Sequence, residues 1–156
     1  MKTIHLSIIV AVSITVLTLI GFYVIRNLEA DASKSITLTD ITINPKILYA
    51  GDNFTMNVTV NNKSTQTIYF FTDQIYPTFD KNVVISHYGG CSEAVSGNIL
   101  MPSQSKKFTL PTSGCHYYVA NSSGIVNALI TLRYDIQKSE YLINASKEFT
   151  IFQVGG

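Results

Sequence analysis

The chain has no tryptophan, only two cysteines and little charge of either sign. Lys, Arg, Asp and Glu make up 13% of its 156 residues, and the formal net charge is +1. Nucleic-acid-binding domains carry a strongly basic surface, so we do not expect this near-neutral chain to bind nucleic acid. Without tryptophan it cannot contain the Cys–Trp–Cys pattern of true immunoglobulin domains. No nucleophilic serine elbow or paired-carboxylate arrangement is present, so we predict no enzyme activity and no cofactor.

A long apolar run occurs once, near the N-terminus. Residues 6–25 are 20 consecutive uncharged and mostly apolar residues. As a helix with a rise of ~1.5 Å per residue, this run is about 30 Å long, which matches the hydrocarbon core of a lipid bilayer. We therefore predict a signal-anchor or transmembrane helix over residues 1–27, followed by a short linker at residues 28–35.

The same run also permits interpretation as a cleaved signal peptide. Residues 30–32 are Ala-Asp-Ala, the small-residue spacing that signal peptidase uses, and cleavage there would release a soluble domain from Ser33. We favour the uncleaved anchor, because the apolar part of a signal peptide spans only about 7–15 residues. Lys2 and the terminal amine precede the helix, which favours a single-pass topology with a cytoplasmic N-terminus and an extracytoplasmic C-terminal domain.

The remainder of the chain, residues 36–154, has the pattern of antiparallel β-strands. Apolar and polar residues alternate over residues 54–60 and again over residues 126–136. Between residues 36–39 and 41–43 the alternation changes phase, which indicates a bulge or a switch between sheets. Seven or eight such segments, separated by turn residues, predict a single all-β domain, an Ig-like antiparallel β-sandwich.

The turns of this region resemble those of a known family. Residues 49–54 lead into residues 57–64 in the manner of the opening hairpin of bacterial and archaeal surface Ig-like modules, such as the cell-adhesion-related domain. Residues 100–105 resemble the Leu-x-Pro-Gly-x-Ser turn of these modules, with Ser103 where Gly is usual. The whole chain is similar to membrane-anchored Ig-like proteins of archaea. The resemblance implies a structural or interaction module of the cell envelope without catalytic residues, and a protein or glycan of the envelope as partner.

The two cysteines, Cys91 and Cys115, are separated by 23 residues. Outside the cytoplasm two such thiols oxidise together, so we predict a disulfide, which would stabilise the fold by about 3 kcal/mol in the chain-entropy model. An alternative is a copper or zinc site that His87 and His116 complete. We favour the disulfide, because Cys115 and His116 are adjacent and neighbouring residues of a strand point to opposite faces.

Five Asn-x-Ser/Thr sequons are present, a mild excess over the number that composition alone gives. Two lie on the polar face of a predicted strand and three in turn-like segments, so we expect all five to be exposed and predict N-glycosylation. The alternative is that these Asn, Ser and Thr residues simply populate solvated strand faces and turns. The sequons begin at Asn53, Asn57, Asn62, Asn121 and Asn144.

Aromatic residues are concentrated between residues 69 and 79, and they permit two interpretations. We favour a role in the core and in covering one sheet edge, while the alternative is a binding patch for a partner protein or glycan. The cluster consists of Tyr69, Phe70, Phe71, Tyr76 and Phe79.

Three classes of function remain open. We favour a membrane-tethered, extracytoplasmic interaction or structural module, held in the bilayer by residues 6–25. A second class is a protease inhibitor that inserts the loop at residues 73–80, and a third is a metal-handling envelope protein that uses the cysteine–histidine group.

Overall fold

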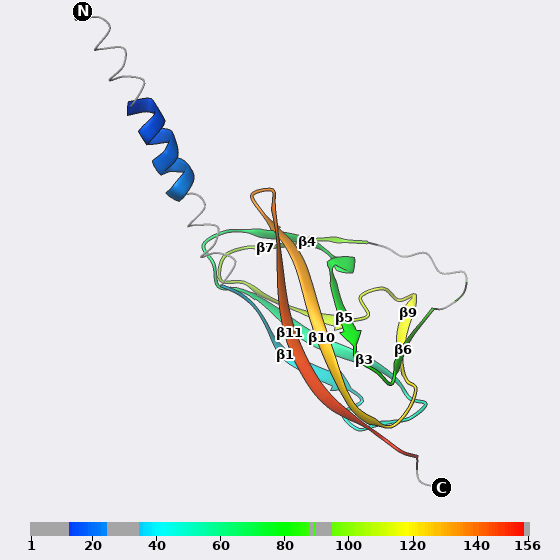
Figure 1. The fold of residues 1–156 in the computed structure, drawn as a ribbon. Helices are drawn as coiled ribbons and strands as arrows, with labels where there is room; N and C mark the ends of the chain where they lie inside the picture. Colours follow the sequence, from blue (N-terminus) through cyan, green and yellow to red (C-terminus); the bar gives the residue numbers. More distant parts are fainter. Residues whose placement is uncertain (1–12, 25–34, 88, 90–94, 155–156) are drawn as a thin grey trace, which may run out of the picture.

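The structure is a computed structural model that describes residues 13–24, 35–87, 89 and 95–154. It contains two β-sheets packed face to face with the hydrophobic core between them (Figure 1). The predicted all-β, Ig-like sandwich is thus confirmed, although eleven strands are present among the described residues because several are short pieces of interrupted strands. The elements are β1 (Ile36–Asn44), β2 (Leu48–Tyr49), β3 (Asn53–Asn62), β4 (Ile68–Phe71), the 3-10 helix η1 (Thr72–Gln74), β5 (Ile75–Phe79), β6 (Val83–His87), β7 (Gly97–Leu100), β8 (Ser105–Leu110), β9 (His116–Ala120), β10 (Gly124–Ile136) and β11 (Ser139–Phe152).

Strand β3 is the centre of the five-stranded sheet. One side of β3 pairs with β1, and the other side is shared by two strands in succession. β8 pairs with residues 56–61 of β3, and β9 pairs with residues 53–54. β6 pairs with β9 and forms the far edge of this sheet.

Strand β10 has the same role in the six-stranded sheet. β11 pairs with all 13 residues of β10 on one side, and β2 adds to β11 in parallel. The other side of β10 is shared by β5, which pairs with residues 128–132, and β4, which pairs at Asp135. β7 pairs with β4 and forms an edge. Each sheet therefore has a long central strand and one interrupted neighbour.

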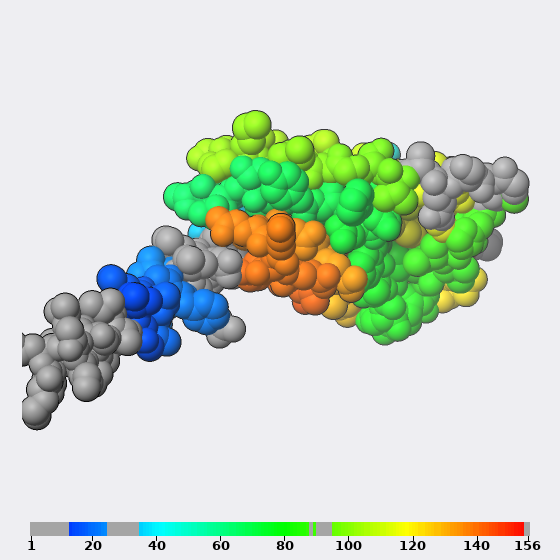
Figure 2. Space-filling model, turned by 90° about the horizontal axis from the view of Figure 1, so that it is seen from above, coloured from blue at the N-terminus to red at the C-terminus, as the bar shows by residue number. Residues whose placement is uncertain are grey.

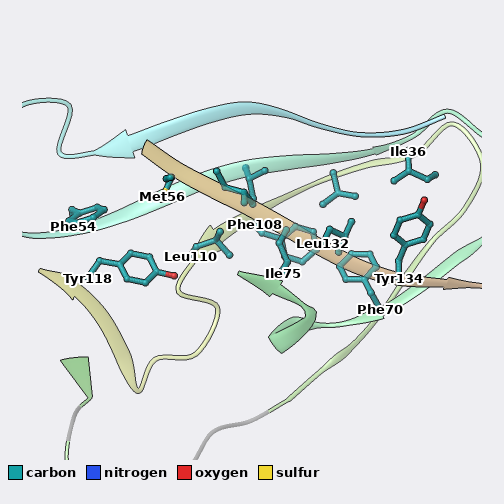
Figure 3. Close-up of a cluster of buried hydrophobic side chains, with 14 of the residues drawn as sticks. Ile36, Phe54, Met56, Phe70, Ile75, Phe108, Leu110, Tyr118, Leu132 and Tyr134 are labelled. Atoms are coloured by element: carbon teal, nitrogen blue, oxygen red, sulfur yellow. The ribbon is translucent and has the colours of Figure 1, made fainter. Parts of the chain in front are cut away.

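The alternating residues of β3 and β10 fill the space between the sheets. Phe54, Met56, Val58 and Val60 of β3 are buried, as are the even-numbered residues 126–136 of β10, in agreement with the predicted pattern. Burial of an aliphatic or aromatic side chain of this size stabilises the fold by ~1.5–3 kcal/mol. Figure 3 shows buried side chains of both sheets meeting in one layer, among them Met56 of β3 and Leu132 of β10.

The predicted phase change in β1 is a β-bulge. The pairing with β3 shifts between Thr39 and Thr42, so that one extra residue is accommodated on β1. Asp40 lies in the bulge with a φ of 51°. The bulge allows Ile36 and Leu38 on one side of it, and Ile43 on the other, to pack against the same core.

The N-terminal helix is described over residues 13–24, and its larger apolar side chains are exposed. Within the described part of the chain, no helix combines the length and apolar character needed to cross a bilayer. The flanking residues 6–12 and 25 of the apolar run lie outside the described residues, as does most of the linker at residues 28–35.

Candidate interaction surface

Strands β4 and β5 divide the aromatic cluster between the core and the surface. Phe70 is buried and Phe79 packs against the core, whereas Tyr69, Phe71 and Tyr76 are exposed. This division follows from the strand period of two, which points successive side chains to opposite faces of the sheet. Both interpretations of the cluster therefore apply, each to a different set of side chains.

Strand β7 extends the exposed aromatic side chains into a continuous apolar area. Ile99 pairs with Tyr69, and Gly97 pairs with Phe71. Tyr69, Phe71 and Ile99 are 48%, 52% and 59% exposed. We call these three residues and Gly97 the β4–β7 apolar surface. It borders a shallow hollow of about 290 Å³, and Figure 2 shows β4 (green) lying between β7 (yellow-green) and the β10–β11 hairpin (orange).

The main chain of β7 is unpaired on its outer side among the described residues. Directly beyond the ends of β4 and β7, the Thr72 amide donates a hydrogen bond of 2.9 Å to the Ser96 oxygen, and the Ser96 amide donates to Thr72 Oγ1 at 3.1 Å, so the main chains of these two residues face each other. Such pairs alternate along a ladder, so the amide and carbonyl groups of Gly97 and Ile99 point away from β4. Sequence reasoning missed this edge, because residues 99–101 are three consecutive apolar residues with no alternation.

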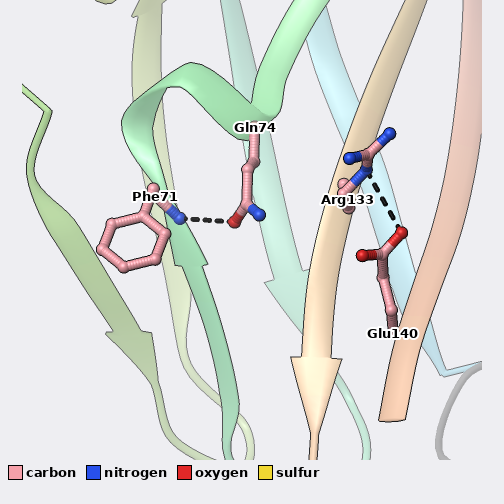
Figure 4. Close-up of polar contacts among 4 residues, drawn as sticks. All are labelled: Phe71, Gln74, Arg133 and Glu140. Atoms are coloured by element: carbon pink, nitrogen blue, oxygen red, sulfur yellow. Dashed lines mark hydrogen bonds and ion pairs between the residues drawn. The ribbon is translucent and has the colours of Figure 1, made fainter. Parts of the chain in front are cut away.

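Figure 4 shows two polar contacts of the six-stranded sheet, one at the end of β4 and one between β10 and β11. The Phe71 amide donates to Gln74 Oε1 at 2.7 Å, which closes η1 and fixes the break between β4 and β5. Arg133 Nε lies 3.3 Å from Glu140 Oε1 across the β10–β11 pair. Both of these charged side chains are well exposed, and such pairs contribute ~0–1 kcal/mol, so this ion pair adds little to the stability of the fold.

The outer face of the other sheet is polar. Asn57 Oδ1 accepts from Thr109 Oγ1 at 2.9 Å, and Asn61 Nδ2 donates to Thr39 Oγ1 at 2.8 Å. Ser105 Oγ donates to Asn61 Oδ1 at 2.7 Å. These hydrogen bonds link β1, β3 and β8, while the buried Thr37 Oγ1 of β1 has no partner among the described residues. Over β1, β3 and β8 the outer face therefore differs in chemistry from the β4–β7 apolar surface of the six-stranded sheet.

The structure brings together the two histidines of the predicted cysteine–histidine group. His87 and His116 are paired residues of β6 and β9, and their ring centroids lie 3.9 Å apart. Cys115 is buried and is not a free thiol. Cys91 lies outside the described residues, so the disulfide between the two cysteines stays a prediction. Among the described residues no group of three or more metal-ligating side chains is present.

The expectation that every sequon is exposed is wrong at Asn62. Its side chain is 0% exposed, and Nδ2 donates to the main-chain oxygens of Gln66 and Leu100, at 2.8 Å each. Oδ1 accepts from the Ser64 hydroxyl at 2.6 Å. Every second residue of β3 from Phe54 onward points into the core, and Asn62 is the next in this series. The period of two in the sequence could therefore have revealed that Asn62 is buried.

The other sequons have different environments. Asn53, Asn121 and Asn144 are exposed, while Asn57 is half-buried within the polar rows of the five-stranded sheet. Asn144 Oδ1 accepts from Thr131 Oγ1 at 2.8 Å, a contact that uses its oxygen and not the nitrogen to which a glycan attaches. The prediction of glycosylation stays untested at all four positions, of which Asn53, Asn121 and Asn144 are the exposed ones.

Comparison with known proteins finds similarity of fold and none of sequence. No protein-family model matches it, and no curated protein sequence matches it. It is similar to the ASH / PapD-like domain of human CEP192 (PapD-like domain 7), with 8% identity and a TM-score of 0.46 over 80% of this chain and 89% of that one. It is also similar to native alpha-2-macroglobulin from Escherichia coli, spanning domain MG7 to the C-terminus, with 11% identity and a TM-score of 0.48.

The second match covers 78% of this chain but only 17% of the macroglobulin chain. At such identities the likeness concerns the two-sheet Ig-like or PapD-like sandwich. The two sheets of this chain form the Ig-like β-sandwich that the turn sequences imply, and the narrower resemblance to the cell-adhesion-related domain stays a prediction. In accord with that turn resemblance, Ser103 has a φ of 63°, in the left-handed region that favours glycine.

Proposed function

We propose that the chain is a membrane-tethered interaction module whose β-sandwich lies outside the membrane and binds an extended polypeptide segment along β7. The observation that carries the proposal is the β4–β7 apolar surface beside an unpaired main-chain edge. We propose no catalytic activity for it.

The chemistry of the edge favours an extended polypeptide over a folded surface or a glycan. Outward-pointing amide and carbonyl groups at Gly97 and Ile99 match the main chain of an added strand. Proteins usually protect such edges with charged residues, proline or bulges. β7 has the sequence Gly-Asn-Ile-Leu and carries no such protection. Tyr69, Phe71 and Ile99 would contact apolar side chains at every second position of the added strand.

The N-terminal segment supports the tether. Leu17, Leu19, Phe22 and Tyr23 project from different sides of the described helix and are all exposed. A helix that is apolar all round requires a hydrophobic environment, and the lipid hydrocarbon supplies one. Two cysteines and several accessible sequons suit an oxidising, extracytoplasmic location for the domain.

A selection from a library of short peptides against the full chain in lipid nanodiscs tests the proposed binding. Selected peptides are expected to alternate apolar and polar residues, and to slow hydrogen exchange of the Gly97 and Ile99 amides. Ile99→Pro removes an amide that does not pair with β4, so the fold should persist while binding is lost. Ile99→Val is the matched control and should bind normally.

Retained binding in Ile99→Pro, or protection confined to other strands, would contradict the β7 site. Protease treatment of intact cells that express the full chain tests the tether separately. Before treatment the full chain should sediment with the membrane fraction, and external protease should then digest the domain. Full protection from external protease would rule out the extracytoplasmic location.

A further inference from the structure

A pocket opens between the two sheets where each has its interrupted strand. η1 separates β4 from β5 on one wall, and residues 111–115 separate β8 from β9 on the other. Thr112 Oγ1 donates to the Thr72 oxygen at 2.8 Å and so joins the two interruptions at the rim. The pocket has a volume of about 200 Å³ and shares no lining residue with the hollow at the β4–β7 apolar surface.

Tyr118 of β9 presents an unpaired polar group to this pocket. Its side chain is 3% exposed, and its hydroxyl makes no hydrogen bond with any of the residues that the structure describes. Figure 3 shows this hydroxyl pointing away from Phe54 and toward Leu110. Burial raises the pKa of Tyr118, so the phenol is neutral and can both donate and accept a hydrogen bond. Among the described residues, Thr37 Oγ1 is the only fully enclosed side-chain polar atom without a partner, so the Tyr118 hydroxyl is not sealed in the core. It lies open to the pocket that Tyr118 lines, where a hydroxyl group of a ligand can take the place of water as its hydrogen-bond partner.

The remaining lining limits what the occupant can be. Ile75, Pro77, Ile85 and Pro111 give apolar walls. The volume exceeds the ~150 Å³ of a cavity that binds benzene and is smaller than the ~300–1,000 Å³ of sites for drug-sized ligands. A single ring therefore fits, whereas a nucleotide or a larger cofactor does not. Asp73 at the rim disfavours a carboxylate through like-charge repulsion.

We propose that this pocket binds an aromatic ring with one hydroxyl group, and that the Tyr118 hydroxyl forms a hydrogen bond with the hydroxyl of the ligand. The ring belongs to a small phenolic molecule or to a tyrosine side chain of a partner polypeptide. The proposal is independent of binding along β7, because the two sites have no residue in common.

Two matched pairs of water-soluble probes test the site on the full chain in nanodiscs by the NMR shifts of the Ile75 and Ile85 methyl groups. N-acetyltyrosine amide and N-acetylphenylalanine amide differ by one hydroxyl, and so do 4-hydroxybenzyl alcohol and benzyl alcohol. In at least one pair the hydroxylated probe should bind about fivefold more tightly, which is the effect of one neutral hydrogen bond. Tighter binding of the amino-acid pair would indicate a tyrosine side chain of a polypeptide, and tighter binding of the benzyl alcohol pair would indicate a small molecule. Either result supports the site.

Tyr118→Phe removes one oxygen and should abolish the preference for the hydroxylated probe while binding of the other probe is unchanged. Tyr117→Phe, on the opposite face of β9, should retain the preference. Ile85→Trp fills the mouth of the pocket and should prevent binding of all four probes. The proposal would be overturned if Tyr118→Phe kept the preference for the hydroxylated probe, or if Ile85→Trp bound the probes as well as the wild type. It would also be overturned if no probe shifted the methyl signals, as expected of a pocket that holds only water.

Discussion

Asn62 of β3 donates a hydrogen bond of 2.8 Å from Nδ2 to the main-chain oxygen of Leu100 on β7, and so joins the two sheets through one side chain. The same Nδ2 donates to the Gln66 oxygen, and Oδ1 accepts from the amide and hydroxyl of Ser64. All polar atoms of this fully buried side chain are paired. Asn62 therefore closes the turn after β3 and fixes the position of the edge strand β7.

Replacement of Asn62 by alanine should destabilise the domain by about 2–4 kcal/mol, because it leaves buried carbonyl groups without donors. Urea denaturation followed by circular dichroism measures the change in the free energy of unfolding. Asn61→Ala is the matched control: its bonds to Thr39 and Ser105 lie on the solvent-facing side, so the loss should be about 0.5–1 kcal/mol. Equal losses in the two variants would contradict this role of Asn62.

Glycans on the folded protein should occur at the exposed sequons and not at Asn62. Attachment at Asn62 Nδ2 would replace a hydrogen that the native bonds use and would require space inside the core. Expression in a host that glycosylates secreted proteins, followed by mass spectrometry of glycopeptides, measures occupancy at each asparagine. We expect modification among Asn53, Asn121 and Asn144, and a natively folded fraction with glycosylated Asn62 would show this prediction to be wrong.

Stability should fall as the pH rises above about 10. Burial raises the pKa of Tyr118, and burial together with the nearby Tyr141 raises the pKa of Tyr134 from 10.0 to about 12. At a pH above the pKa of tyrosine in the unfolded chain and below the raised pKa in the folded chain, the unfolded chain loses phenolic protons that the folded chain retains. Deprotonation therefore favours unfolding. The full contribution of the two protonated tyrosines to stability is present at any pH below the pKa of tyrosine in the unfolded chain.

Each such tyrosine contributes a slope of about 1.4 kcal/mol per pH unit at most. Urea denaturation at a series of alkaline pH values should therefore give a steeper loss for the wild type than for Tyr118→Phe. Parallel curves would mean that Tyr118 ionises equally easily in the folded and unfolded chains.

Gly124→Ala should destabilise the start of β10 by about 1–3 kcal/mol. Gly124 has a φ of 138°, and a Cβ atom there would lie 2.9 Å from Asn82 Nδ2. That nitrogen donates to the Ser123 oxygen at 3.3 Å, so the substitution also disturbs a native contact. Thermal denaturation measures the effect against Gly114→Ala, where a Cβ meets no atom within 4 Å. A melting temperature no lower than that of the control would refute the strain argument.

Much of the fold could be predicted from local patterns. The alternation over residues 54–60 and 126–136 identified the two central strands, because one buried face imposes a period of two. The phase change after Thr39 indicated the bulge in β1 for the same reason. Ile99 was missed because a run of apolar residues does not indicate which side chain faces solvent.

The sequence by itself determined which side chains of each strand point inward, since that choice depends on residues next to one another in the chain. The tertiary structure alone decided which strands are neighbours, and with it the contact of Asn62 with β7, the pocket at Tyr118 and the uncovered edge at Ile99. These features depend on pairing between segments far apart in the chain, and local periodicity carries no information about such pairing.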